Sequence, residues 1–337
     1  MSAQPMLAIF AALLVGCAGK YGGTPMAKKV TMPAGGLEAA ALPYSVIDAR
    51  TGRQIDNDAF WGQLGQARAI CIGEDHSNIH HHWAQLEITK QLVQRKTAGD
   101  RLALGLEMFQ RPFQGVVDDY AAKRIDAAAL QARAGWEERW GFPFGFYGPI
   151  MDLTVAAGGQ LLALNAAREL TKKVSRKGMA ALTPEEKAQV PELDLADAKH
   201  RAWFDALMDS MGGTHAHSKP PAEDGAPASP HTGPAMPSAD QIYSVQVLWD
   251  ETMADGAARW LTSNPTGRVI ILAGNGHCHD SAIVSRIKRR GIAQVVSIRP
   301  VLDIDSSEVL AQPINDFAFV LEASAAIKAK RAEDEKQ

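Results

Sequence analysis

The stretch that decides the fold is RAICIGEDHSNIHHHWAQ, residues 68–85. It opens with a short apolar run that ends at Ile72, and it continues from Gly73 as a polar segment with two carboxylates and four histidines. Short, nearly continuous apolar runs are typical of strands that are buried on both faces, as in a parallel sheet covered by helices. From Trp83 onward, large apolar residues recur near helical spacing. The stretch therefore predicts a buried strand, a polar turn and a helix.

The apolar pattern returns four more times along the chain. The segments are RLALGLEM (101–108), GQLLALNA (159–166), RVIILAGNGH (268–277) and AQVVSIRP (293–300). Segments with helical periodicity lie between them, including AFWGQLGQ, PFQGVVDDYAAK and DSAIVSRIKRR. Strands that alternate with helices favour a parallel sheet. We therefore expect a single α/β domain over residues 44–325, with a mostly parallel central sheet flanked by helices.

Two segments depart from this pattern. Residues 212–240 are dense in Pro, Gly, Ala and Ser, with too few large apolar side chains to fold. We expect a disordered surface loop there, inserted between helices at 195–211 and 241–262. Residues 326–337 are expected to form a charged C-terminal tail.

The first residues have the features of a secretory signal. The run from Met6 to Gly16 is too short to cross a bilayer but fits the apolar part of a signal peptide. It ends in Leu-Val-Gly-Cys, which resembles a bacterial lipobox, so residues 1–17 are interpreted as a lipoprotein signal with Cys17 as the lipidated residue. Residues 18–43 would then be a flexible tether, and the protein would be anchored in the bacterial cell envelope, by expectation at the outer membrane. The alternative is an apolar tail with a chance cysteine, because no Lys or Arg precedes the run.

Composition and cysteine content narrow the function only a little. The 337 residues carry a formal net charge of −3, which gives no electrostatic argument for nucleic acid as a partner. The other two of the three cysteines are Cys71 and Cys278. A disulfide between them is conceivable in an oxidising compartment, but free buried thiols are favoured, because both lie next to apolar strand residues.

Polar side chains gather where the expected strands end. In open α/β sheets, ligands bind at the carboxyl ends of the strands. We therefore expect the functional site at this edge. The residues concerned are Glu74, Asp75 and His76 after the first strand, Glu107 after the second, Asn165 and Arg168 after the third, and His277 and His279 after the fourth.

Two of these strand ends have the form Gly-x-x-His, at 73–76 and 274–277. If the two strands are neighbours, the imidazoles of His76 and His277 can converge, and Glu74 or Glu107 can complete a site for a divalent ion. Glu107 would be buried, which is costly without a partner, and Arg168 or a metal ion is the expected partner. A structural ion pair is the alternative role for Glu107.

The run of histidines at 80–82 cannot face one site, because consecutive helical residues are about 100° apart. His76 and His80 are spaced i, i+4, so this pair is expected to share a face. We expect one histidine of the run to reach the site or a bound group, and the others to be exposed.

The motifs at these strand ends resemble those of the ChaN-like haem-binding lipoproteins, within a wider group that includes the Tiki metalloproteases and the erythromycin esterases. The resemblance extends roughly over residues 70–298, interrupted by the loop at 212–240. It rests on the stretches IGEDHSNIHHHWAQ, LGLEMFQRPFQGVVDDY, WEERWGFPFGFYGPI, LLALNAAREL and LAGNGHCHDSAI.

What the resemblance implies differs between the branches of the group. ChaN-like proteins bind two stacked haems in a dimer, with each iron held by a tyrosine of one subunit and a propionate held by a histidine of the other. The Tiki branch uses its two Gly-x-x-His histidines and a glutamate at a catalytic metal. His76, Glu107 and His277 match those metal ligands, with zinc or manganese as the candidate ion, and Glu74 would activate the water.

For haem, a tyrosine is a sensible ligand, because a phenolate is a hard donor that prefers ferric iron. Tyr147 is the leading candidate, since it lies in the aromatic and Gly/Pro-rich segment GFPFGFYGPI; Tyr120 and Tyr243 follow. Other residues expected to contact the cofactor are His76, His80, Asn165 and Arg168.

Three functions remain open from the sequence. The favoured one is a membrane-anchored haem-binding lipoprotein for haem and iron uptake, acting as a homodimer, with an outer-membrane haem transporter as a possible partner. The second is a metal-dependent hydrolase or peptidase, although an enzyme is the less favoured expectation. The third is a binding or scaffolding lipoprotein whose site is vestigial.

Overall fold

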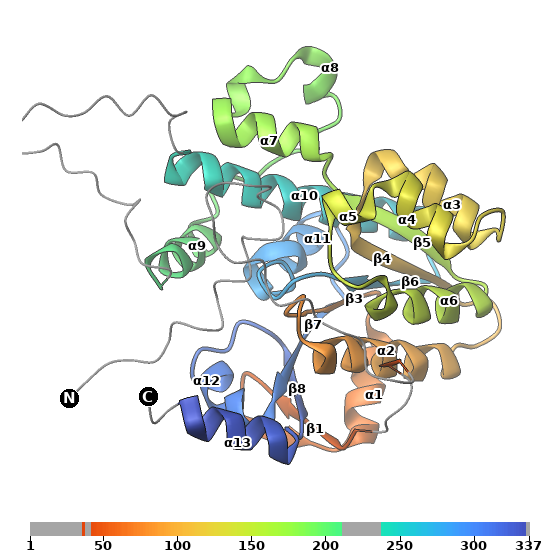
Figure 1. Ribbon diagram of the computed structural model, residues 1–337, viewed down its shortest axis with the longest axis vertical. Coiled ribbons are helices and arrows are strands. Elements are labelled where there is room, and N and C mark those ends of the chain that lie inside the picture. Colours follow the sequence, from red (N-terminus) through yellow and green to blue (C-terminus); the bar gives the residue numbers. More distant parts are fainter. Residues whose placement is uncertain (1–35, 38–41, 211–236, 335–337) are drawn as a thin grey trace, which may run out of the picture.

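The core of the protein is one sheet, built from the apolar runs of the sequence (Figure 1). The computed structural model describes residues 36–37, 42–210 and 237–334. Within them the sheet has eight strands in the order β2-β1-β8-β7-β3-β6-β4-β5. The strands are β1 (Tyr44–Asp48), β2 (Arg53–Ile55), β3 (Ala69–Ile72), β4 (Arg101–Gln110), β5 (Gln160–Asn165), β6 (Gly267–Leu272), β7 (Val295–Leu302) and β8 (Phe317–Leu321).

The sheet is mostly parallel. Strands β3 to β8 pair in parallel, and β1 is antiparallel to both β2 and β8. The expected α/β class, with a mostly parallel sheet flanked by helices, is confirmed. The signal segment with Cys17, most of the tether at 18–43 and most of the loop at 212–240 lie outside the described residues.

Helices cover both faces of the sheet, as the continuous apolar strands require. Side chains of a strand alternate between the two faces. Ile70 and Ile72 point into the larger core with α1, α2 and α6, whereas Ala69 and Cys71 pack into the core formed with α10 and α11. The longer helices are α1 (Asn57–Gln66), α2 (Ile79–Gln94), α3 (Gln114–Ala121), α4 (Ala127–Ala134), α6 (Gly148–Ala156), α7 (Arg168–Lys177), α9 (Ala198–Ser210), α10 (Ala239–Ser263) and α13 (Ala325–Asp334).

Short helical segments complete the fold. They are α5 (Trp136–Arg139), α8 (Pro184–Lys187), α11 (Ser285–Arg289), α12 (Ser306–Ala311) and the single turns at Arg111–Phe113, Phe144–Phe146, Met179–Ala181, Asp280–Val284 and Asp303–Asp305. Helices α9 and α10 flank residues 211–236, where the sequence predicts helices on either side of the insertion. Helix α13 covers most of the segment that was expected to be a charged tail. None of the described helices is both long and apolar enough to span a membrane.

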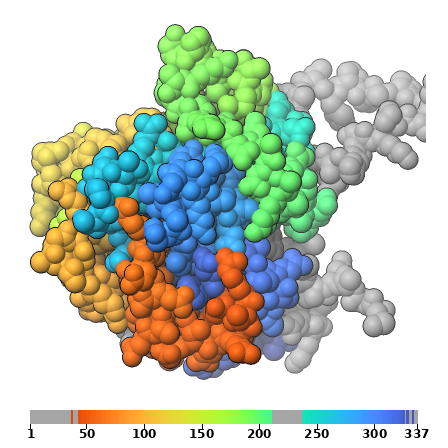
Figure 2. Space-filling model, turned by 180° about the vertical axis from the view of Figure 1, so that it is seen from behind, coloured from red at the N-terminus to blue at the C-terminus, as the bar shows by residue number. Residues whose placement is uncertain are grey.

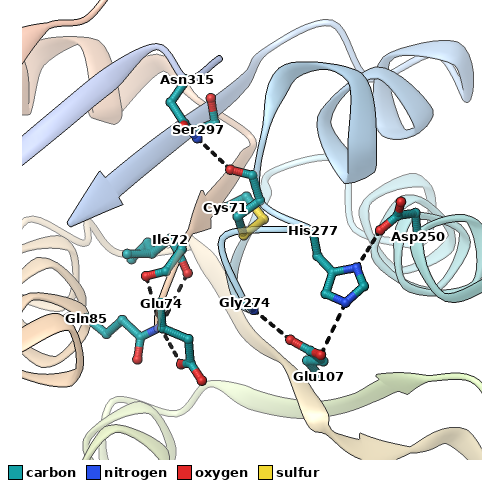
Figure 3. The surroundings of a disulfide bond; sticks show 12 residues. Cys71, Ile72, Glu74, Gln85, Glu107, Asp250, Gly274, His277, Ser297 and Asn315 are labelled. Atoms are coloured by element: carbon teal, nitrogen blue, oxygen red, sulfur yellow. Dashed lines mark hydrogen bonds and ion pairs between the residues drawn. A yellow bond between two sulfur atoms is a disulfide. The ribbon is translucent and has the colours of Figure 1, made fainter. Parts of the chain in front are cut away.

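Cys71 and Cys278 form a disulfide, so the expectation of free thiols is wrong (Figure 3). Strands β3 and β6 are neighbours, and the turn after β6 folds back over β3 because the Cys278 N–H donates to the Gly274 carbonyl. This turn brings the two Cα atoms to 5.3 Å, within the usual range for a disulfide. Apolar surroundings alone do not decide between thiols and a disulfide; the proximity of the two strands does.

Candidate functional site

The polar strand ends meet at one edge of the sheet. Because β6 lies between β3 and β4, the segments that follow these strands are adjacent. Figure 3 shows Glu74, Glu107 and His277 grouped around the turn that begins at Gly274, next to the disulfide. This edge is where ligands bind in open parallel sheets.

Both glycines of the Gly-x-x-His motifs lie where another part of the site approaches closely. A Cβ atom at Gly73 would overlap the Asn275 side chain. A Cβ atom at Gly274 would lie 3.0 Å from Cε1 of His76. The two turns are therefore packed against each other, and His76 lies directly over the backbone of the second motif.

Glu74 is the centre of a buried hydrogen-bond cluster. Its carboxylate accepts a bond from Nδ1 of His76 at 2.6 Å, from the Tyr147 hydroxyl at 2.7 Å and from the Gln85 amide at 2.8 Å. Nδ1 of His82 lies 3.5 Å away. The Glu74 side chain is 0% exposed, so these partners replace its hydration.

The cluster separates the proton affinities of its members. Burial raises the pKa of the Glu74 carboxyl, but His82 and His76 more than reverse this effect and lower it to about 2. Burial likewise opposes protonation of His76, yet the hydrogen bond and charge of Glu74 raise its pKa to about 9. Near neutral pH, Glu74 and His76 are therefore an ion pair.

His277 is held in a similar way from the opposite face of the sheet. Its Nδ1 donates to Asp250 of α10 at 2.6 Å, and its Nε2 lies 3.4 Å from Glu107. Despite burial, His277 and then His200 lower the pKa of the Asp250 carboxyl. Burial lowers the pKa of His277, but the Glu107 and Asp250 carboxylates produce a net increase. His76 and His277 are thus each hydrogen-bonded through Nδ1 to a carboxylate.

Glu107 lies between the two histidines. Strand β4 continues to Gln110, beyond the predicted end, and its pairing with β5 is irregular between Leu106 and Gln110, which places Glu107 in a bulge. Its Oε2 accepts a 2.7 Å bond from the Gly274 N–H. The expected pairing with Arg168 is wrong, because the Arg168 guanidinium instead donates to the Glu138 carbonyl. Asn165 donates to the backbone carbonyl of Glu107 at 2.9 Å.

The histidine run is arranged differently from the expectation. Helix α2 begins at Ile79, after its N-cap Asn78, so His76 lies in the preceding turn and does not share a helical face with His80. His82 is the member closest to Glu74, and its ring stacks on Phe146 at 4.2 Å.

The prediction that the remaining histidines are exposed is also wrong. His81 is buried and accepts a hydrogen bond from the Asp75 N–H at 2.9 Å, so it stabilises the turn before α2. Burial, with His82 next, lowers the pKa of His81 to about 3. The His80 side chain is only partly buried, and burial lowers its pKa.

An aromatic cluster covers the site on the side of α5 and α6. Trp140 and Phe142 contact the ring of His76, with centroid distances of 4.7 and 5.1 Å. Tyr147 is 0% exposed, and burial followed by the Glu74 charge raises the pKa of its hydroxyl well above 10. The structure therefore places Tyr147 at the site as a buried hydrogen-bond donor.

A small cavity opens beside Glu107. It has a volume of about 20 Å³, which is close to the space of a single water molecule. Its walls include Trp140, Trp249, Asn165 and Arg168. The predicted contact residues Asn165 and Arg168 thus share one cavity with Glu107.

A metal ion has no support from this geometry. In the parts of the chain that the structure describes, no group of three or more His, Cys, Asp or Glu side chains is arranged to hold a metal ion. His76 and His277 each donate Nδ1 to a carboxylate, which leaves Nε2 as the ring nitrogen that could bind an ion, and Glu107 accepts from a backbone N–H. The zinc or manganese ion allowed by the sequence is unsupported because the described side chains do not converge on one point.

Several residues of the site escaped sequence reasoning. Asp250 and Gln246 of α10 both contact His277, and they are spaced i, i+4 within an otherwise apolar helical stretch. Polar residues at that spacing on a buried face were the available signal. Gln85 of α2 also holds Glu74, and no local pattern marks it.

Comparison with known proteins identifies the family. Residues 60–287, well over half of the chain, match the family described as haem-binding uptake, Tiki superfamily, ChaN. The chain belongs to this ChaN family. The resemblance seen in the strand-end motifs is therefore confirmed, since both motif glycines and both motif histidines lie within the matched range.

A solved structure agrees with the ChaN fold. A structure described as cofacial heme binding to ChaN of Campylobacter jejuni has a TM-score of 0.61 and 16% identity, and the match covers 83% of this chain and 97% of that chain. A mutant of the erythromycin esterase EreC in its open conformation matches with a TM-score of 0.41 and 12% identity, over 85% of this chain and 84% of that chain, which is too distant to carry an argument. No curated protein matches the chain significantly.

Proposed function

We propose that this ChaN family member is a membrane-anchored lipoprotein that binds haem for haem and iron uptake. The observation that carries the proposal is the family match over residues 60–287. The proposed anchor is a lipid on Cys17, and the proposed location is the cell envelope. The disulfide between Cys71 and Cys278 supports that location, because disulfides persist in oxidising compartments. The proposed partner in uptake is an outer-membrane haem transporter.

We further propose that haem binds between two subunits. The cavity beside Glu107 has a volume of about 20 Å³, whereas sites that enclose a small-molecule ligand measure about 300–1,000 Å³. A porphyrin therefore cannot enter this cavity, and it would lie across its mouth. A second subunit would then cover the other porphyrin face, which gives a reason for a dimeric site.

Tyr147 is the proposed iron ligand. Of the described tyrosines, it is the one that contacts the Glu74 cluster, whereas Tyr120 donates to Asp152 and Tyr243 packs between α9 and α10. Ligation sets a clear condition: the Tyr147 hydroxyl must leave Glu74, and the aromatic cover must move to admit the porphyrin. Haem binding is therefore coupled to a rearrangement of residues 142–147 in this proposal.

The propionates would be held by cations at the mouth of the cavity. Arg168 forms no ion pair with a carboxylate anywhere in the described residues, and it lies on the cavity wall. Asn165 lines the same wall, and His76 is bonded to Glu74. His80 is a further proposed contact, because its side chain is partly exposed. Arginine binds carboxylates well because its planar donors match the two oxygens.

Titration of the purified protein with hemin tests the proposal. The expected result is a charge-transfer spectrum of tyrosinate-ligated ferric haem, which Tyr147→Phe abolishes. Tyr120→Phe is the matched control, because it removes the same hydroxyl from a tyrosine outside the Glu74 cluster, and it should leave the spectrum unchanged. Loss of the spectrum in the control alone would transfer the ligand role to Tyr120, and no spectral change with the wild-type protein would contradict haem binding.

A further inference from the structure

Three arginines mark the opposite edge of the sheet. Arg68, Arg101 and Arg268 stand at the amino ends of β3, β4 and β6, which are consecutive neighbours in the sheet. Three of the apolar runs in the sequence, RAICIGE, RLALGLEM and RVIILAGNGH, begin with one of these arginines. This edge lies away from the Glu74 cluster, so the candidate haem site does not account for the arginines.

A second cavity lies among them. Its volume is about 170 Å³, several times the roughly 30 Å³ that a water molecule takes up in the liquid. Arg68, Arg101, Arg268 and Lys96 all line it, and Asp100 is the single carboxylate on its wall. Figure 2 shows the molecule from behind, where the cyan residues of α10 border the orange residues of the N-terminal elements.

Two of the arginines have an evident structural role. Arg68 donates to the carbonyls of Leu261 and Asn264 at the end of α10, and Arg268 donates to those of Gly65 and Ala67 at the end of α1. Arg68, at the start of β3, therefore caps α10, which leads into β6. Arg268, in β6, caps α1, which leads into β3. Neither helix has a basic residue of its own in its last turn.

These caps leave a positive charge uncompensated. A helix carboxyl end carries roughly half a negative charge. The ends of α1, α2 and α10 together with Asp100 therefore offset somewhat more than half of the four cations, and roughly one and a half positive charges remain. None of the four cations forms an ion pair with a carboxylate of the described chain, and the side-chain bonds of the arginines go to backbone carbonyls and to Asn264. Arg101 and Lys96 have no structural role of the kind that Arg68 and Arg268 have.

We propose that this cavity binds a phosphate group, carried by a soluble phosphorylated molecule or by a phospholipid headgroup. Phosphate presents oxygens in several directions, and guanidinium donors from three strands surround the cavity. Arginine pairs with phosphate through two parallel hydrogen bonds, and such charge-assisted bonds are among the stronger ones in proteins. The proposal does not depend on haem binding at the other edge.

Isothermal titration calorimetry with inorganic pyrophosphate and inorganic phosphate tests the soluble source. The variant is Lys96→Gln with Arg101→Gln, because the Lys96 side chain forms no hydrogen bond with the described residues and Arg101 is exposed with one side-chain bond to Asn264. The matched control is Lys90→Gln with Lys172→Gln, which removes two exposed charges outside the cavity. The variant is expected to bind at least about tenfold more weakly than the wild type, with the control unchanged.

Flotation with vesicles tests the lipid source. Binding to phosphatidylglycerol vesicles but not to phosphatidylcholine vesicles, with the same loss in the Lys96→Gln/Arg101→Gln variant, would assign the cavity to a headgroup. Absence of binding in both experiments would overturn the proposal. Binding that falls equally in the variant and in the control would overturn it as well, because general surface charge would then be responsible.

Discussion

Removal of the disulfide is expected to destabilise the protein strongly. Cys71 and Cys278 are 207 residues apart, and both side chains are fully buried. In the chain-entropy account, a crosslink over such a loop stabilises the folded state by about 5 kcal/mol. This value is an upper estimate, since native disulfides contribute about 2–5 kcal/mol when they are removed from small domains.

The assay is urea unfolding of Cys71→Ala, Cys278→Ala and the double variant, each compared with the oxidised wild-type protein. Either single substitution breaks the bond, so the account predicts that the double variant loses little more free energy of unfolding than each single variant. Two independent buried thiols would instead give losses that add. Additive losses near 1 kcal/mol each, together with titration of both thiols in the unfolded wild type, would refute the disulfide.

The remaining predictions concern the cluster at the carboxyl edge. The pKa of His76 is raised from 6.5 to about 9. The stabilisation that its protonated form gives to the fold is therefore complete below pH 6.5 and is lost as the pH rises through 9. In urea unfolding, the free energy of unfolding should fall by about 3 kcal/mol over this range, and His76→Gln should remove the fall. Gly73→Ala places a methyl group on the Asn275 side chain and should cost about 1–3 kcal/mol, and Asn275→Ala should restore most of the loss. Asp250→Asn leaves His277 without its buried carboxylate and should cost about 3–5 kcal/mol in thermal or urea unfolding.

Each of these predictions has a distinct contradicting result. If the free energy of unfolding of His76→Gln depends on pH as that of the wild type does, the ion pair between His76 and Glu74 is not the cause of the pH dependence. If Asn275→Ala fails to rescue Gly73→Ala, the close packing of the two turns is not the reason for the glycine. Unchanged stability in Asp250→Asn would show that His277 does not need a charged partner. Lys90→Gln, at an exposed position, serves as the surface control throughout.

The sheet and the gathering of polar side chains at its carboxyl edge could be predicted because their signals are local. Continuous apolar runs such as the one ending at Ile72 indicate burial on both faces of the sheet. The helical segments between these runs favour parallel pairing of the strands. The two Gly-x-x-His motifs marked the edge where these polar side chains meet for the same reason. Their glycines turned out to be needed for the approach of two turns, which is a property of the folded pair rather than of either motif.

The disulfide and the partner of His277 could not be predicted, because both depend on contacts between segments that are distant in the sequence. The order of the strands places the turn after β6 over β3, which creates the disulfide and which no local pattern announces. Asp250 meets His277 only because α10 packs on that face of the sheet. The histidine run was misread because the N-cap at Asn78 starts the helix later than assumed, and this shift moves His76 off the helix.

Native mass spectrometry of the hemin-saturated protein tests the central claim most directly. The account predicts a homodimer that carries two haems, with dimer formation dependent on hemin. A monomer that carries no haem under the same conditions, or a monomer that binds haem without forming the dimer, would contradict it.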